Sequence, residues 1–477
     1  MGQEIVASHF RQQDFDEFRE RLRVETGLLL AGLEESAFSS RDGIGGFELE
    51  AWLVDQGVHP APVNKEFLER LDNPLVVPEL ARFNVELNGH PQLLQADALS
   101  RMESELTATM AHCNRVAAGI DVSVLTIGIL PTVAEDELTP RNMSDMKRYR
   151  ALNEQVLRLR EGKPLELDIL GQDHLSTRHA DVMLESATTS FQIHLKISPE
   201  RAVRAYNAAL VASAPMVAVS ANSPYLFGRD LWDETRIPLF EQSVAVGGYA
   251  GAAHGPIRRV TFGSGYARES IGECFVENLE HSPVLLPMNF ETGEEQFSHL
   301  RLHNGTIWRW NRPLVGFDDD GSPHLRIEHR VVPGGTSVAD NIADAAFFFG
   351  LIFYYSGCDD APEHSLAFAS ARDNFYAAAR NSLSAQINWL DGERGPVQML
   401  VQDRLLDEAR QGLESRGVAA AESNHYLGII EARVRESRTG SAWQREYVAA
   451  HECDMTGLTR AYLERQQQGR PVHEWKL

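Results

Sequence analysis

The stretch GIGGFELEAWLVD, from Gly43 to Asp55, carries two glutamates one residue apart inside a segment that otherwise resembles a buried strand. Successive side chains of a strand point to opposite faces, so residues of equal parity share a face. The apolar face therefore begins with Phe47 and Leu49, and the opposite face begins with Glu48 and Glu50. This strand predicts a sheet with one face in the core and one face that holds carboxylates.

Three further segments repeat this arrangement, namely FNVELN (residues 83–88), SFQIHLKI (190–197) and LRIEHRVV (325–332). Any one of them can be an ordinary amphipathic strand with a solvated side. Together they would crowd four glutamates into one concavity, where like charges are tolerated only with bound cations or raised pKa values. We therefore predict a metal site whose ligands come from these polar faces: Glu48, Glu50, Glu86, His194 and Glu328.

The ligand types in this set indicate which metal it holds. Carboxylates with one imidazole and no thiolate favour Mg²⁺, or Mn²⁺, over zinc, and such sites keep room for water and substrate phosphates. Arg330 shares the polar face of Glu328 and would neutralise charge on a transferring phosphoryl group. An ion pair between Arg330 and a neighbouring glutamate is an equally open role.

Charge and composition narrow the class of protein. The chain has 477 residues, a formal net charge of -23 and ordinary hydrophobic content, which argues against nucleic-acid and anionic-membrane binding because those need clustered Lys and Arg. The four cysteines form no CxxC pair and the N-terminal residues contain no apolar run, so we expect a cytoplasmic protein. The apolar segments 205–221 and 345–355 are expected to be buried helices rather than membrane spans.

Hydrophobic periodicity predicts strands through the first two thirds of the chain and helices in the last third. Expected strands are 47–54, 83–88, 122–128, 190–197, 258–262, 307–310 and 325–332. Expected helices are 14–30, 99–118, 146–160, 199–219, 338–355, 363–383, 397–416 and 421–468, the last with a break and cap at Gly440 and Ser441. We predict an α+β fold with an antiparallel or mixed sheet. Residues 1–336 would form the catalytic part, and residues 337–477 a helical part packed on the same unit.

The constellation resembles the glutamate-cysteine ligase superfamily, in particular its bacterial carboxylate-amine ligase branch, which is related in fold to glutamine synthetase. The matching pieces are the E-x-E strand, the Glu of FNVELN, the His of SFQIHLKI, the segment SANSPYLFGRDLWDETR (220–236) and the late strand RIEHR (326–330). They run from about Gly43 to Val332. The residue between the first two glutamates is Leu49, where this branch often has another acid.

The resemblance implies a curved antiparallel sheet that forms a funnel, with two or three Mg²⁺ ions between its glutamates and the phosphates of ATP. It implies that a carboxylate, typically the γ-carboxylate of glutamate, is activated as an acyl phosphate. An amine, such as cysteine or another amino compound, then forms an amide with release of ADP and phosphate. By the same resemblance, the five metal candidates are metal ligands, and Arg330 is a catalytic residue that contacts phosphate and binds ATP. Asn222 and Arg236 are residues on the substrate side of the site, and Arg236 is also catalytic.

A second polar cluster lies in HLRLHNGTIWRWNRPL, from His299 to Leu314. Trp308 is a candidate for stacking on adenine, and a Trp-rich core edge explains it equally simply. Arg301 and Arg309 are candidates for binding a substrate carboxylate. The expected partners are small molecules, and a homo-oligomer is compatible with the sequence.

Two other functions stay open on the sequence. A phosphotransferase of the guanidino kinase type would use a similar sheet and metal-bound ATP. A non-catalytic relative would keep the fold and bind a nucleotide or metabolite as a sensor.

Overall fold

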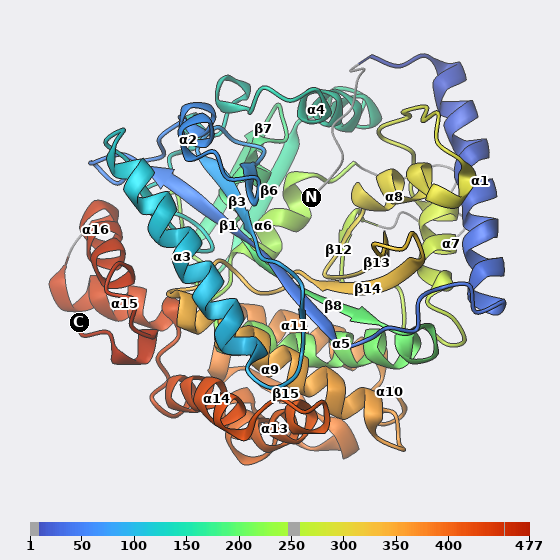
Figure 1. Cartoon of the computed structure of the whole chain (residues 1–477). Coiled ribbons are helices and arrows are strands. Elements are labelled where there is room, and N and C mark those ends of the chain that lie inside the picture. The colour runs from blue at the N-terminus through green and yellow to red at the C-terminus, as the bar shows by residue number, and fades with distance from the viewer. Residues whose placement is uncertain (1–8, 247–257, 453) are drawn as a thin grey trace.

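The structure is a computed structural model that describes residues 9–246, 258–452 and 454–477. Residues 1–8, which belong to the N-terminal stretch from which we expect a cytoplasmic protein, lie outside this part. Its centre is a curled antiparallel sheet, which confirms the predicted α+β class (Figure 1). Across the sheet the strands follow the order β13 (Asn311–Phe317), β14 (Pro323–His329), β8 (Phe191–Ile197), β1 (Ile44–Val54), β3 (Asn84–Asn88) and β2 (Val76–Pro78). Two short strands, β4 (Gln92–Leu93) and β5 (Ser123–Leu125), pair with the ends of β1.

Helices enclose the sheet. They are α1 (Gln12–Glu34), α2 (Asn64–Leu71), α3 (Ala98–Ala118), α4 (Lys147–Leu159), α5 (Pro199–Ser220), α6 (Arg236–Ser243), α7 (Gly272–His281), α8 (Ser298–Gly305), α9 (Val338–Gly357), α10 (Pro362–Ser365), α11 (Phe368–Asn381), α12 (Val397–Leu400), α13 (Leu406–Ser415), α14 (Ala420–Arg435), α15 (Gly440–His451) and α16 (Met455–Gln466). A π-helical turn, Val401–Leu405, joins α12 to α13. Short two-stranded sheets complete the chain: β6 (Leu165–Leu170) with β7 (His174–His179), β9 (Tyr225–Leu226) with β10 (Arg229–Asp230), β11 (Val260–Thr261) with β12 (Trp308–Arg309), and β15 (Gln386–Asn388) with β16 (Arg394–Pro396).

The apolar face of the sheet packs on α5 and α9, the two most apolar helices (Figure 1). Both are long and apolar enough to cross a bilayer, but 89% of each apolar window is buried inside the protein, as in the core helix of a folded domain. His329 illustrates the contact, because its ring stacks on Phe348 of α9 at a centroid distance of 4.2 Å. The prediction that both apolar segments are buried helices is confirmed.

Strand β1 begins at Ile44, three residues before the predicted start at Phe47. The glycines Gly45 and Gly46 lie inside the strand. A Cβ atom on Gly45 would come within 2.7 Å of the Phe349 ring and 2.9 Å of Leu94. A larger residue at this position would have to displace these two side chains. Gly43, just before the strand, has a φ of +72°, which favours glycine.

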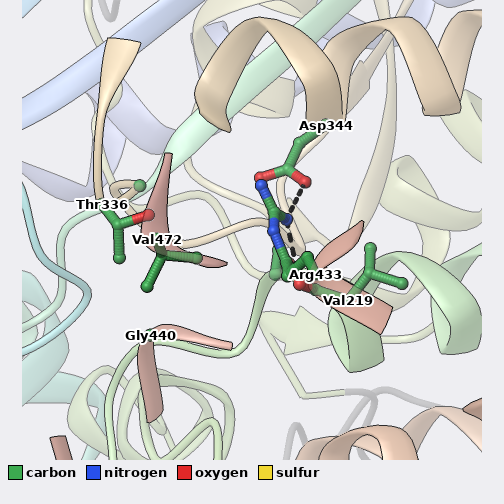
Figure 2. A pocket seen from close by; sticks show the side chains of 8 residues that line it. Val219, Thr336, Asp344, Arg433, Gly440 and Val472 are labelled. Atoms are coloured by element: carbon green, nitrogen blue, oxygen red, sulfur yellow. Dashed lines mark hydrogen bonds and ion pairs between the residues drawn. The ribbon is translucent and has the colours of Figure 1, made fainter. Parts of the chain in front are cut away.

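A buried ion-pair group joins two of the C-terminal helices, α9 and α14. Arg433 of α14 lies 2.8 Å from the Asp340 carboxylate and 2.6 Å from that of Asp344, both on α9. A cavity of about 10 Å³, enough for one water molecule, adjoins this group (Figure 2). None of the residues that line it belongs to the predicted metal set, so we assign the cavity to the packing of α9 against α14.

Candidate active site

Strand register brings three of the predicted ligands together on the polar face of the sheet. His194 of β8 is paired with Gly46 of β1 on one side and with Glu328 of β14 on the other. Its Nε2 lies 3.4 Å from Glu48 and 3.8 Å from Glu328. One ligand atom from each of Glu48, His194 and Glu328 lies within 4.8 Å of the other two, so the three side chains can hold one metal ion.

The chemical state of His194 suits metal binding. The residue is only 8% exposed, and within the described part of the chain its Nε2 makes no hydrogen bond. Burial lowers the pKa of His194 to about 4, so the ring is neutral at pH 7, which is the form that binds metals. A buried ring nitrogen without a hydrogen-bond partner, beside two carboxylates, fits a divalent cation.

Glu328 is held as an ionised carboxylate by two arginines. Arg312 of β13 binds it with both arms, from Nε at 2.7 Å and from Nη2 at 3.0 Å, and Arg330 adds a contact at 3.1 Å. Burial alone would raise the pKa of Glu328, but these guanidinium groups hold it well below its usual range. Each carboxylate oxygen has more than one lone pair, so a cation can share it with an arginine.

Glu50 and Glu86 face each other across β1 and β3. Burial raises the pKa of Glu50 to about 7, with further repulsion from Glu79. The pKa of Glu86 is raised well above its usual value by burial and by the charges of Glu48 and Glu79. This crowding is the behaviour predicted for the polar face, where excess negative charge must be balanced by protons or cations.

Charge is distributed unevenly across this face. On β1 and β3 the ionisable side chains are acidic, whereas β8 and β14 add Lys196 and Arg326, which lie opposite each other in the register. Two more arginines belong to this basic half. Arg330 follows Glu328 in the chain, whereas Arg326 precedes it, and Arg312 lies opposite Glu328 on β13. The Glu48, His194 and Glu328 group lies on the boundary, so a cation held there would adjoin both an acidic and a basic region.

A family model described as glutamate-cysteine ligase family 2 (GCS2) matches residues 44–468. The chain belongs to this family of ligases. The resemblance inferred from the strands is thereby confirmed, and the match extends through the C-terminal helices, where the sequence motifs were least specific. No curated protein sequence matches the chain.

Two solved structures of ligases share the family 2 fold at low identity. Glutamate–cysteine ligase from Francisella tularensis, in complex with AMP, has 12% identity and a TM-score of 0.55, with 92% of this chain and 90% of that chain covered. A bifunctional glutathione synthetase from Pasteurella multocida has 11% identity and a TM-score of 0.50, with 95% of this chain and 55% of that chain covered. At such identities the likeness concerns the fold.

The predicted substrate-side residues Asn222 and Arg236 are both buried away from solvent. Arg236 pairs with Glu234 at 3.0 Å and donates to the backbone carbonyls of Arg330 and Val331. These contacts therefore fix the backbone at Arg330 and Val331. Asn222 binds the Gly334 carbonyl and Tyr462, each at 2.8 Å. A direct role of either residue in binding substrate stays a prediction.

The second predicted cluster is spread over three elements. Arg309 of β12 is buried and binds Glu277 of α7 at 2.6 Å, and Arg301 of α8 is exposed. Trp308 is half-buried and meets Phe240 at a ring distance of 6.0 Å; Phe240 in turn has the Arg330 guanidinium 6.0 Å from its ring centre. The Phe240 ring thus separates Trp308 from Arg330. The predicted roles of Arg301, Arg309 and Trp308 in binding substrate or ATP remain predictions.

Sequence reasoning missed several residues that border the site. Gln192, Lys196 and Arg326 share the parity of His194 and Glu328, so the face rule could have identified them. Glu79 follows β2 and Glu185 lies in a short 3₁₀ helix, Met183–Ala187, so neither had a periodic signal. The pKa of Glu185 is raised to about 8 by burial and by the charges of Glu79 and Glu50, which extends the acidic half of the site.

Proposed function

We propose that the chain is an ATP- and Mg²⁺-dependent carboxylate-amine ligase. It would activate a carboxylate, with the γ-carboxylate of glutamate as the first candidate, and join it to cysteine or another amine with release of ADP and phosphate. The observation that carries this proposal is the buried Glu48, His194 and Glu328 group beside Arg312 and Arg330 in a family 2 chain.

The reaction needs no nucleophilic residue from the protein. A carboxylate oxygen of the donor forms a bond to the γ-phosphorus of ATP, and the bond to the bridging oxygen breaks, so ADP leaves with the electron pair. The amine nitrogen then forms a bond to the carbonyl carbon and loses a proton. The carbon–oxygen bond breaks, and phosphate leaves with the oxygen that came from the donor carboxylate.

The basic half of the face suits a polyphosphate in an otherwise acidic protein. Arg330 and Arg312 are held next to Glu328, and Arg326 lies two residues before Glu328. Lys196, opposite Arg326, is bound to Asp318 at 2.6 Å, so the positive charge of this half comes chiefly from the three arginines. Fixed positive groups aimed at developing charge are the main source of catalysis in phosphoryl transfer. Glu48, His194 and Glu328 would hold Mg²⁺, which when bound offsets the repulsion between the donor carboxylate and ATP.

The finer assignments in this proposal are those implied by the resemblance. They include two or three Mg²⁺ ions with Glu50 and Glu86 as additional ligands, Mn²⁺ as a substitute, and roles for Asn222, Arg236, Arg301, Arg309 and Trp308 toward the substrates. A cytoplasmic location, small-molecule partners and a homo-oligomeric state belong to the same proposal.

Coupled turnover tests the proposal. Purified protein with Mg²⁺, ATP and panels of carboxylic acids and amines should release ADP only when an acid and an amine are both present. Mass spectrometry should then find the amide. A folded protein that releases no ADP with any pair would overturn the proposal. A stable phosphorylated acceptor without amide would instead support a phosphotransferase.

A further inference from the structure

Gln192 of β8 connects the acidic and basic halves of the site. Its side-chain amide donates to Glu50 Oε1 at 2.9 Å, and its carbonyl oxygen accepts a hydrogen bond from Arg330 Nη1. The residue is 3% exposed and pairs with Glu48 in the β1 and β8 register. One neutral side chain therefore lies between a carboxylate and a guanidinium group.

Glu50 and Arg330 each make a further contact besides the hydrogen bond to Gln192. The other oxygen of Glu50 accepts from the Ser190 backbone N–H at 2.6 Å, and this contact holds only one end of the carboxylate. Arg330 binds Glu328 at 3.1 Å, and within the described residues its Nε has no hydrogen-bond partner. Gln192 thus binds one oxygen of Glu50 and the Arg330 Nη1 that also donates to Glu328, so it lies directly between the acid and the base.

Arginine and carboxylate groups that meet in a buried setting form strong, charge-assisted hydrogen bonds. If Glu50 paired with Arg330, its charge would be neutralised and the oxygens would be turned away from a cation. A primary amide prevents this because one planar group offers a donor to the acid and an acceptor to the base. Glutamate at the same place would accept from Arg330 and repel Glu50.

We propose that Gln192 is a positioning residue that separates Glu50 from Arg330 and so keeps Glu50 available to a divalent cation. This inference rests on the proposed function, since it assigns Glu50 to the cation side of that site. Gln192 itself touches no reacting atom and acts through its two neighbours.

Binding of Mn²⁺ without nucleotide, followed by electron paramagnetic resonance, tests the inference. Gln192→Met keeps the side-chain length and removes both hydrogen bonds. It should weaken Mn²⁺ binding about tenfold, as removal of an outer hydrogen-bond partner of a metal ligand does. In an Arg330→Met background, Glu50 has no arginine to pair with, so adding Gln192→Met should cause little further loss.

Gln192→Glu provides the matched control. It retains the acceptor for Arg330 and loses only the donor to Glu50, so Mn²⁺ should bind more tightly than it does to Gln192→Met. A purely packing role predicts the opposite ranking, because the buried charge disturbs the core more than the apolar side chain does. Unfolding curves of each variant report whether the fold is intact.

The outcomes separate the inference from the proposed function. Equal losses from Gln192→Met in both backgrounds, no loss in either, or a loss limited to Gln192→Glu would overturn the positioning role. If the parent protein binds no Mn²⁺, or if Glu328→Gln binds it as well as the parent does, the metal site of the proposed function itself is wrong. A loss of Mn²⁺ binding on Gln192→Met that is much smaller in the Arg330→Met background than in the parent supports the inference.

Discussion

Glu50 and Glu328 lie on the same face of the sheet, yet their pKa values are shifted in opposite directions. Glu328 contacts two guanidinium groups and stays ionised, whereas Glu50 lies among carboxylates and its pKa is raised to about 7. The sequence predicts that these residues share a face, because parity follows directly from the strand pattern. It did not reveal that Arg312 binds Glu328, since that contact depends on β13, a strand that was not predicted.

Glu328→Gln tests the metal group at this scale. The amide is a poor ligand for Mg²⁺ and leaves Arg312 and Arg330 without their carboxylate, so ligase turnover should fall at least about a hundredfold. Glu166→Gln, on the exposed side of β6, is the matched control and should leave turnover unchanged. Steady-state ADP release measures both variants. A Glu328→Gln enzyme that turns over like the parent would remove Glu328 from the site.

Most predicted elements of the core sheet and of the long helices are present, with boundaries that differ by a few residues. Two kinds of error have clear physical causes. The predicted helix 363–383 is broken into α10 and α11. The stretch 421–468 forms three helices, one more than the predicted break at Gly440 and Ser441 gives, because a further turn interrupts the helical pattern before α16. Strand β6, LELDIL, alternates cleanly and the parity rule could have identified it. Strand β7 and the short helices α6 to α8 were missed because their periodic runs are short or mostly polar.

Helices α9 and α13 cross so closely that glycine is required at the contact. A Cβ atom on Gly412 would lie 1.9 Å from the Gly350 carbonyl oxygen, and one on Gly350 would lie 2.3 Å from the Ala409 carbonyl oxygen. Backbone atoms cannot move aside cheaply. Gly412→Ala should therefore lower the free energy of unfolding by about 3 kcal/mol or more.

Gly428→Ala on α14 is the matched helical control. No atom lies within 4 Å of a Cβ placed there, so alanine should raise the free energy of unfolding by about 0.5 to 1 kcal/mol through its helix propensity. Denaturant unfolding of the two variants compares them directly. Similar effects of the two substitutions would contradict the close crossing of α9 and α13.

At the scale of the whole molecule, the net charge of -23 argues against polyanion binding by the surface in general. It does not argue against a local site that binds a polyphosphate. The basic half of the site is built locally from residues that three separate segments contribute, and total composition does not reveal it. The family and fold could be predicted from four strands. The roles of Asn222, Arg236 and Trp308 could not be worked out in the same way, because motif position does not determine which atoms a side chain contacts.

Acid should destabilise the molecule partly through His303. Its Nε2 lies 3.1 Å from the Asn278 carbonyl oxygen, and burial lowers its pKa from 6.5 to about 4. The unfolded chain gains a proton below pH 6.5 while the folded chain does not, so stability falls as pH drops through this window and levels off below about 4. Between pH 7 and 5 the loss from His303 should be roughly 2 kcal/mol.

His303→Gln keeps a nitrogen donor for the carbonyl and removes the titration. Its unfolding free energy should therefore decline less between pH 7 and 5 than that of the parent protein, by the same roughly 2 kcal/mol. Urea unfolding at a series of pH values measures the difference. Identical pH profiles for the two proteins would show that His303 is not kept neutral by burial.

In the proposed reaction, a carboxylate is activated by transfer of a phosphoryl group before the amine attacks. Turnover with a donor whose carboxylate oxygens are labelled with ¹⁸O, followed by mass analysis of the released phosphate, tests this order of steps. If an acyl phosphate forms, each phosphate should carry one labelled oxygen from the donor and the amide should retain the other. ADP release with amide formation but unlabelled phosphate would contradict it.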